Sequence, residues 1–195
     1  MRRRQRGGRV FVLSGPSGGG KTTVVERVRH TMPRLVRSVS VTTRTPRPGE
    51  RHERDYRFVS PEMFQRLRRS GQLLEWAKVH SALYGTLKQP VLRALANGRD
   101  VILSIDVQGA CKVRRALGER AVLVFLLPPS MTDLRQRLLR RRTDTPAAIR
   151  RRLAAAKREM ACARWYDYTV VNDRLPQAIA RVQAVIQGKC EQRKG

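Results

Sequence analysis

The run Gly15-Pro16-Ser17-Gly18-Gly19-Gly20-Lys21-Thr22 constrains the fold of this 195-residue chain more than any other feature. It matches the phosphate-binding loop pattern without a gap, and it lies between an apolar stretch at Val10–Ser14 and a helical pattern at Lys21–Thr31. Glycines in such a loop let backbone N–H groups surround a phosphate, while a lysine adds a cation and the Thr22 hydroxyl can hold Mg²⁺. The sequence predicts a nucleoside triphosphate as ligand, but the motif does not specify the reaction.

Apolar and amphipathic stretches alternate along the rest of the chain. Strands are predicted at residues 10–14, 39–43, 56–59, 73–79, 101–105, 121–127 and 168–171. Helices are predicted at residues 21–31, 61–70, 87–96, 108–117 and 176–187, with two more that begin after the capping residues Ser130 and Thr145. This alternation favours an α/β fold with a parallel sheet. The turn-forming residues 46–49 between two half-buried strands indicate a small strand-rich insertion.

The formal net charge of +27 comes from 42 Lys and Arg against 15 Asp and Glu. Guanidinium groups bind phosphate through paired hydrogen bonds, so the charge fits either a nucleic-acid binder or an enzyme of phosphorylated substrates. A solvated basic surface without a partner is the third reading. A dedicated nucleic-acid binder should have aromatic residues among its basic ones, and aromatic residues make up only 5% of the chain.

Cysteine usage and hydropathy suggest where the protein resides. Cys111, Cys162 and Cys190 are odd in number and have no metal-ligand spacing, which fits reduced thiols in the cytoplasm. No run of about 18 apolar residues occurs, so no membrane span or membrane partner is predicted.

Several further motifs, in one order along the chain, resemble the guanylate kinase family, whose members move the γ-phosphoryl group of ATP to GMP. They are the run 38–50 (Ser-Val-Ser-Val-Thr-Thr-Arg-Thr-Pro-Arg-Pro-Gly-Glu), Asp55-Tyr56, Glu75, Tyr84-Gly85, the run 105–109 (Ile-Asp-Val-Gln-Gly), Pro128-Pro129-Ser130 and Val171-Asn172-Asp173. The resemblance covers about residues 8–187. It implies a phosphate-loop kinase core with a central parallel sheet flanked by helices, a small mixed GMP-binding lobe and a helical lid. The core would comprise residues 1–38, 89–130 and 165–195, the GMP lobe residues 39–88 and the lid residues 131–164.

The resemblance also implies roles for individual residues. The catalytic set would be Lys21, Arg47, Arg141 and Arg152, and ATP would be bound by Gly15, Pro16, Ser17, Gly18, Gly19, Gly20, Lys21, Thr22, Thr23, Asn172 and Asp173. GMP would be bound by Ser40, Arg44, Arg47, Tyr56, Glu75, Tyr84, Thr86, Ser104 and Asp106. Mg²⁺ would accompany ATP at Thr22, and nucleic acid would bind only through non-specific electrostatics. The protein would be a monomer or a homodimer.

Two positions depart from the family pattern. Many relatives have Asp-x-Asp where this chain has Ser104-Ile105-Asp106, and a lid arginine where it has Leu139. Neither departure removes the core machinery. The alternatives to the family's activity are a related kinase of another small phosphorylated substrate and a non-catalytic interaction module. The loss of phosphate-loop and lid residues would mark the module, yet Lys21, Thr22, Arg141 and Arg152 are present.

Overall fold

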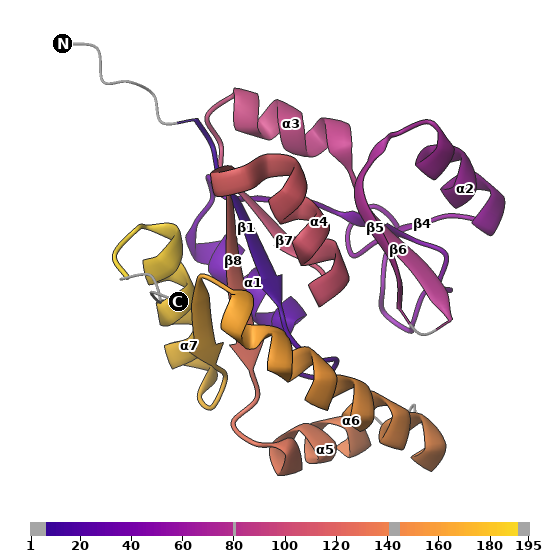
Figure 1. Cartoon of the computed structure of the whole chain (residues 1–195), viewed down its shortest axis with the longest axis vertical. Helices are drawn as coiled ribbons and strands as arrows, with labels where there is room; N and C mark the ends of the chain where they lie inside the picture. Colours follow the sequence, from indigo (N-terminus) through magenta and orange to yellow (C-terminus); the bar gives the residue numbers. More distant parts are fainter. Residues whose placement is uncertain (1–6, 80, 141–144, 191–195) are drawn as a thin grey trace.

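A computed structural model describes residues 7–79, 81–140 and 145–190, and its centre is a five-stranded parallel sheet in the order β2-β7-β1-β8-β9 (Figure 1). The strands are β1 (Val10–Ser14), β2 (Val36–Arg37), β7 (Val101–Ser104), β8 (Ala121–Leu127) and β9 (Tyr168–Val171). Their nearly continuous apolar sequences suit a sheet that is covered on both faces.

Alternate residues of β1 face two different helical layers, because successive side chains in a strand point to opposite faces. Val10 and Val12 pack in one cluster with α3 (Lys88–Ala96) and α4 (Val107–Leu117). Phe11 and Leu13 pack in the other cluster with α1 (Lys21–Thr31) and α7 (Leu175–Ile186). The core is therefore an α/β/α sandwich, and the carboxyl end of β1 leads directly into the glycine-rich loop.

A second, mixed sheet has the order β4-β3-β6-β5 and lies beside the core (Figure 1). It comprises β3 (Ser40–Thr42), β4 (Arg57–Phe58), β5 (Leu73–Val79) and β6 (Ala82–Leu87). Helix α2 (Pro61–Arg69) covers it by inserting the buried side chains of Phe64 and Leu67 against Val41. Ser60 caps this helix by accepting a hydrogen bond from the Met63 N–H, as its sequence predicts.

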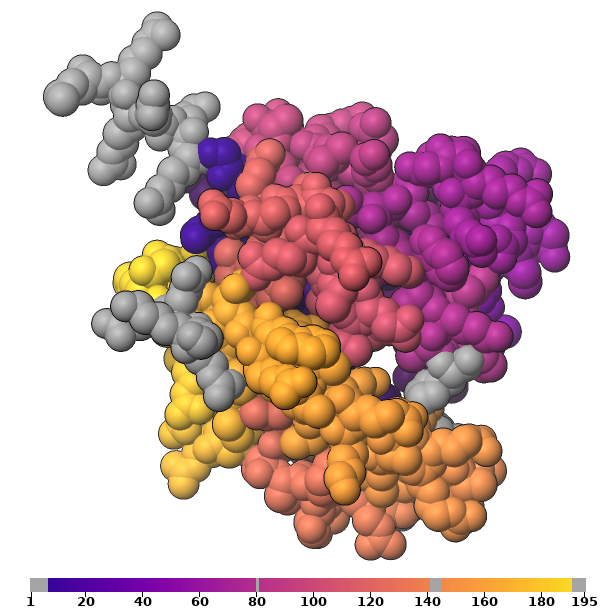
Figure 2. All heavy atoms as spheres, in the orientation of Figure 1, coloured from indigo at the N-terminus to yellow at the C-terminus, as the bar shows by residue number. Residues whose placement is uncertain are grey.

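Helices α5 (Met131–Arg140) and α6 (Pro146–Ala161) form a second projection from the core, separate from the mixed sheet (Figures 1 and 2). They bury a small apolar cluster that includes Leu134, Leu138 and Ile149. Ser130 and Thr145 accept hydrogen bonds from the N–H groups of Asp133 and Ala148, so both predicted caps are confirmed. A short helical segment (Cys162–Trp165) follows α6, and another (Gly118–Arg120) follows α4.

The structure confirms the predicted fold class, and it differs from the prediction in two strands and in the bounds of several elements. Strand β6 was not predicted, and the helix expected from residue 87 begins at Lys88 because Leu87 pairs with Leu73 in the mixed sheet. Strand β2, which has only two residues, was also missed. Helix α4 begins at Val107 rather than at residue 108, and α7 spans Leu175–Ile186 rather than 176–187. Among the helices of the described ranges, none has both the length and the apolar character needed to cross a membrane.

Candidate active site

The glycine-rich loop passes too close to its neighbours to carry side chains at two of its positions. A Cβ at Gly15 would lie 2.2 Å from the Leu126 carbonyl oxygen, and one at Gly20 would lie 2.4 Å from Nδ2 of Asn172. Gly20 also has a φ of 94°, a value that residues with a side chain rarely adopt. The loop geometry therefore depends on these glycines.

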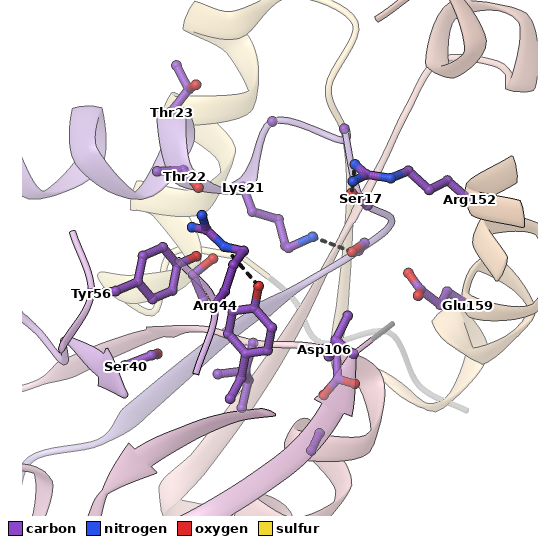
Figure 3. A pocket seen from close by; sticks show the side chains of 18 of the residues that line it. Ser17, Lys21, Thr22, Thr23, Ser40, Arg44, Tyr56, Asp106, Arg152 and Glu159 are labelled. Atoms are coloured by element: carbon purple, nitrogen blue, oxygen red, sulfur yellow. Dashed lines mark hydrogen bonds between the residues drawn. The ribbon is translucent and has the colours of Figure 1, made fainter. Parts of the chain in front are cut away.

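Lys21 folds back over this loop, and its ammonium group donates to the carbonyl oxygens of Gly15 and Pro16 (Figure 3). Its position at the start of α1 places the ammonium beside the loop, where α1 also directs its N-terminal dipole. This concentration of positive potential suits an anion with several negative charges.

One cleft brings most of the predicted site residues together from both sheets and from α6. Of the predicted residues, the following line it: Gly15, Ser17, Gly18, Gly20, Lys21, Thr22, Thr23, Ser40, Arg44, Arg47, Tyr56, Glu75, Tyr84, Ser104, Asp106 and Arg152. Pro16, Gly19, Thr86, Asn172 and Asp173 lie outside its lining. Arg141 lies outside the described residues.

Arg44, which follows β3, and Tyr56, which precedes β4, lie at one end of the cleft (Figure 3), and Tyr84 of β6 lines the same end. Arg44 donates from Nε to the Tyr84 hydroxyl at 3.2 Å, and its guanidinium carbon lies 5.4 Å from the Tyr56 ring centroid. Burial raises the pKa of Tyr56, so this phenol stays protonated and remains a hydrogen-bond donor at neutral pH. A guanidinium and two phenols can satisfy a phosphate dianion together.

Glu50 holds the arginines of this end in place. Its carboxylate accepts two hydrogen bonds from Nη2 of Arg44, at 2.9 and 2.8 Å, and one from the Arg47 N–H at 2.8 Å. Glu50 lies within the run 38–50, but it was not predicted as a site residue. The sequence feature that could have identified Glu50 is its place three residues after Arg47, at a Pro-Gly turn.

Glu75 forms the deep wall of the cleft and is 4% exposed. It pairs with Thr86 across β5 and β6, and the Thr86 hydroxyl donates to Oε1 at 2.7 Å. Ser40 pairs with Thr86 from the other side, so three of the predicted GMP-binding residues lie on neighbouring strands. Burial raises the pKa of Glu75 to about 7, although the hydrogen bond from Thr86 opposes this shift.

Ser104 and Asp106 enter the cleft from the carboxyl end of β7. Asp106 caps α4 by accepting from the Gly109 N–H at 2.8 Å, which fixes the orientation of its carboxylate. Burial raises the pKa of Asp106. Parallel strands end at the same edge of their sheet, so these side chains lie beside the phosphate loop after β1.

Helix α6 supplies two charged side chains to the cleft, seven residues apart on one helical face. Nη1 of Arg152 donates to the Ser17 hydroxyl of the loop at 3.3 Å. Glu159 points into the same space near Asp106 (Figure 3), and burial raises its pKa. Glu159 was not predicted, and its helical spacing from Arg152 is the only signal the sequence offers. Ala77, Val79 and Ile105 are further lining residues that were missed.

Asn172 braces the phosphate loop from behind. It is 6% exposed, and its Nδ2 donates to the Gly19 carbonyl oxygen at 2.8 Å. Its N–H donates to the Leu127 carbonyl oxygen at 2.8 Å, which ties the end of β9 to β8. Asn172 therefore contacts the loop itself, whereas the neighbouring Asp173 is exposed at the surface.

Within residues 7–79, 81–140 and 145–190, no group of three or more His, Cys, Asp or Glu side chains is arranged to hold a metal ion. A hydroxyl such as that of Thr22 fits Mg²⁺, which favours oxygen ligands and takes most of them from substrate phosphates and water.

Comparison with known proteins agrees with this geometry. The sequence profile of the guanylate kinase family matches residues 7–189. The chain is 49% identical to a guanylate kinase of Oleidesulfovibrio alaskensis over 93% of its own length and 87% of that protein. It is 50% identical to one of Mycolicibacterium paratuberculosis over 95% of its own length and 84% of that protein. A crystal structure of guanylate kinase from Anaplasma phagocytophilum matches with a TM-score of 0.79 and 33% identity, covering 93% of this chain and 86% of that one.

Proposed function

The chain belongs to the guanylate kinase family, and from this membership and its cleft we propose that it transfers the γ-phosphoryl group of ATP to GMP, yielding ADP and GDP. One observation carries the proposal most directly. A buried carboxylate with a hydroxyl partner, Glu75 with Thr86, shares a single cleft with the phosphate loop and with Arg44.

The cleft can select guanine through the donors of the base. Guanine presents N1–H and N2–H₂ on one edge, which a carboxylate at Glu75 can accept together, and the Ser40 hydroxyl can donate to O6. The Thr86 hydroxyl donates to Glu75 and so holds that carboxylate. Adenine has an acceptor at N1 and no N2 amine, so it would leave a buried carboxylate unpaired. This contrast favours GMP over AMP.

We assign the reaction to in-line transfer without a covalent enzyme intermediate. A GMP phosphate oxygen forms a bond to the γ-phosphorus of ATP as the bond to the bridging oxygen of ADP breaks. Arg44, Arg47, Tyr56 and Tyr84 would hold the acceptor phosphate. Lys21 and the loop N–H groups would hold the donor phosphates.

The remaining contributions come from the lid and the metal. Arg152, and Arg141 by resemblance, would supply positive charge over the transferring group when residues 131–164 close over the core. Mg²⁺ bound with ATP at Thr22 would offset phosphate charge. Asn172 would act by holding the loop, and Asp173 stays a prediction for the ATP site. In this proposal, residues 39–88 form the GMP-binding lobe and residues 131–164 form the lid.

A coupled assay of ADP formation tests the proposal with GMP, AMP, CMP and UMP as acceptors. We expect GMP to exceed the other three by about 10³-fold or more in kcat/KM. Preference for another phosphorylated acceptor would favour the related-kinase alternative. Absence of turnover with every acceptor would favour the interaction module.

The net charge of +27 supports non-specific binding of nucleic acid as a separate, incidental property in the cytoplasm. Such binding releases counterions, so its affinity should fall steeply as salt rises. Filter binding of random DNA at low and moderate salt measures it, and sequence-specific binding that survives high salt would contradict the incidental role.

A further inference from the structure

Lys112 joins the core to the mixed sheet at the strand that carries Glu75. It lies on α4, and its ammonium group donates to the main-chain carbonyl oxygen of Trp76 on β5. The same ammonium lies 4.4 Å from the centroid of the Trp76 ring, and the guanidinium of Arg68 from α2 lies at an equal distance. One tryptophan is thus held by cations from two helices, immediately after the residue that forms the deep wall of the cleft.

The pairing of β5 with β6 is irregular where Glu75 enters it. Leu73 pairs with Leu87 and Glu75 pairs with Thr86, so Leu74 is an extra residue on one strand, the arrangement of a β-bulge. A bulge redirects the side chains that follow it and weakens the ladder locally. The hydrogen bonds between β5 and β6 therefore fix Glu75 less firmly than they fix the rest of β5. The hydrogen bond from Lys112 to the carbonyl oxygen of Trp76, the next residue, holds the strand at this point.

Helix α4 also meets the Glu75 carboxylate directly. A Cβ placed on Gly109 would lie 2.6 Å from Oε2 of Glu75 and 3.2 Å from Oδ1 of Asp106. The first turn of α4 and the strand carrying Glu75 are therefore in close contact. A shift of α4 relative to β5 would move the carboxylate within the cleft.

Three polar neighbours act on the carboxylate from the elements packed around it. Thr86 on β6 donates to it, Asp106 at the start of α4 repels it, and Lys112 further along α4 attracts it. Burial and Asp106 raise the pKa of Glu75, and Thr86 and Lys112 lower it. Lys112 is the cation of this group, and it opposes the negative charge of Asp106.

We propose that Lys112 is a positioning residue for guanine recognition: through its contacts with Trp76 it fixes β5 against α4, and it places a positive charge near the Glu75 carboxylate that accepts the guanine donors. The inference rests on the proposed function, since it assigns Glu75 to the guanine base. Lys112 itself does not line the cleft and would not contact GMP.

A purely structural role for Lys112 would be to pack on Trp76, and this role predicts a loss of stability without a pH signature. The two roles differ in one measurable respect. Loss of the positive charge raises the pKa of Glu75, so the pH below which GMP binding weakens should move upward. Loss of packing alone would leave that pH unchanged.

The test measures the GMP Kd by calorimetry, and the KM values for GMP and ATP by coupled assay, between pH 6 and 9. The variants are Lys112→Met, which removes the charge, and Lys112→Arg, which keeps it. Arg115→Met is the matched control, because Arg115 is an exposed cation one turn further along α4. Comparing each variant with the parent at the same pH cancels the titration of the GMP phosphate, and thermal unfolding reports on the fold.

We expect Lys112→Met to raise the GMP Kd and KM by about threefold to tenfold at pH 6.5 and by less than about twofold at pH 9, with the ATP KM unchanged. Lys112→Arg should follow the parent more closely than Lys112→Met at every pH, and Arg115→Met should match the parent. If Lys112→Met behaves as the parent does, or if Arg115→Met has the same effect as Lys112→Met, the inference is overturned and the proposed function still stands. A parent that neither binds nor phosphorylates GMP would overturn the proposed function and the inference with it.

Discussion

Gly109 of α4 leaves the space that the carboxylate of Glu75 occupies: a Cβ at Gly109 would lie 2.6 Å from Oε2 of Glu75. The obstructing atom is the far end of a side chain, so the carboxylate can move aside while the backbone stays in place. The packing at this point therefore constrains the site more than it constrains the fold.

We expect Gly109→Ala to raise the GMP KM by about tenfold or more, since a displaced carboxylate no longer meets both guanine donors. The ATP KM should change little. Stability should stay within about 1 kcal/mol of the parent, because alanine favours the helix by about that amount over glycine. Steady-state kinetics and urea unfolding check both statements, and an unaltered GMP KM would show that Glu75 tolerates the displacement.

Glu50 should act on GMP binding through Arg44 and Arg47. In Glu50→Gln the Arg44 guanidinium loses its charged partner, with which it now forms two hydrogen bonds of 2.9 and 2.8 Å. We expect the GMP KM to rise by about tenfold, which corresponds to about 1.4 kcal/mol, while the ATP KM stays constant.

Glu53→Gln is the matched control for this variant. Glu53 pairs with Arg57 in the same lobe, but its side chain is 51% exposed, so its removal should be nearly silent. Equal kinetics for the two variants would remove Glu50 from the positioning of Arg44.

Local signals predicted most of the fold because each acts within a few residues. The apolar run at β8 and the caps Ser60, Ser130 and Thr145 specify their own elements. Strand β6 lacks such a signal: its sequence Ala-Leu-Tyr-Gly-Thr-Leu includes a glycine, and it is stabilised by pairing with β3 and β5. Pairing between distant segments is a tertiary property, which explains why β6 was missed.

The site residues also divide into those that a local sequence motif identifies and those that only tertiary packing brings to the site. The phosphate loop is contiguous, so its motif names every residue of the loop, and the resemblance supplied Glu75 and Arg44. Glu159, Lys112 and Gly109 lie on helices whose faces are set by packing. Only the folded chain shows that Glu159 lines the cleft, that Gly109 lies against Glu75 and that Lys112 bonds to the neighbouring Trp76. The resemblance places Asn172 at the ATP site, and the structure adds that its side chain donates to the Gly19 carbonyl oxygen of the phosphate loop.

Lys21→Ala should retain the fold and lower kcat by about two orders of magnitude or more. One donor that stabilises transition-state charge is typically worth about 3 kcal/mol. The side chain lies over the loop and contacts the carbonyls of Gly15 and Pro16, so its removal leaves no buried cavity in the sheet core. Turnover within threefold of the parent, at saturating ATP and GMP, would exclude Lys21 from catalysis.

Ser104→Asp introduces the acidic residue that many relatives carry at this position. Ser104 lines the cleft beside Asp106, whose pKa burial already raises, so a further carboxylate would face like charge. We expect the GMP KM to change by less than about tenfold, or 1.4 kcal/mol. A larger gain in affinity would indicate that the chain prefers an acceptor other than GMP.

Glu75 should make the free protein less stable as pH rises. Its pKa is about 7 in the folded chain against an ordinary value of 4.5, so between these values the folded state binds more protons than the unfolded state. The free energy of unfolding therefore falls with increasing pH across this window, by up to about 3 kcal/mol for a shift of this size. Glutamine has no such titration.

We accordingly expect Glu75→Gln to gain stability relative to the parent as pH rises from 4.5 to 8, by about 2 to 3 kcal/mol, although it should lower kcat/KM for GMP by at least about 10²-fold. Urea unfolding of both proteins without nucleotide measures the difference, and titrating groups that do not interact with Glu75 cancel between them. Glu62→Gln serves as control, because Glu62 is exposed on α2 and has a lowered pKa, so any trend should have the opposite sign. A stability difference between Glu75→Gln and the parent that stays constant from pH 4.5 to 8 would mean that Glu75 ionises in the folded protein as it does in the unfolded chain, and burial would then have no part in its selectivity.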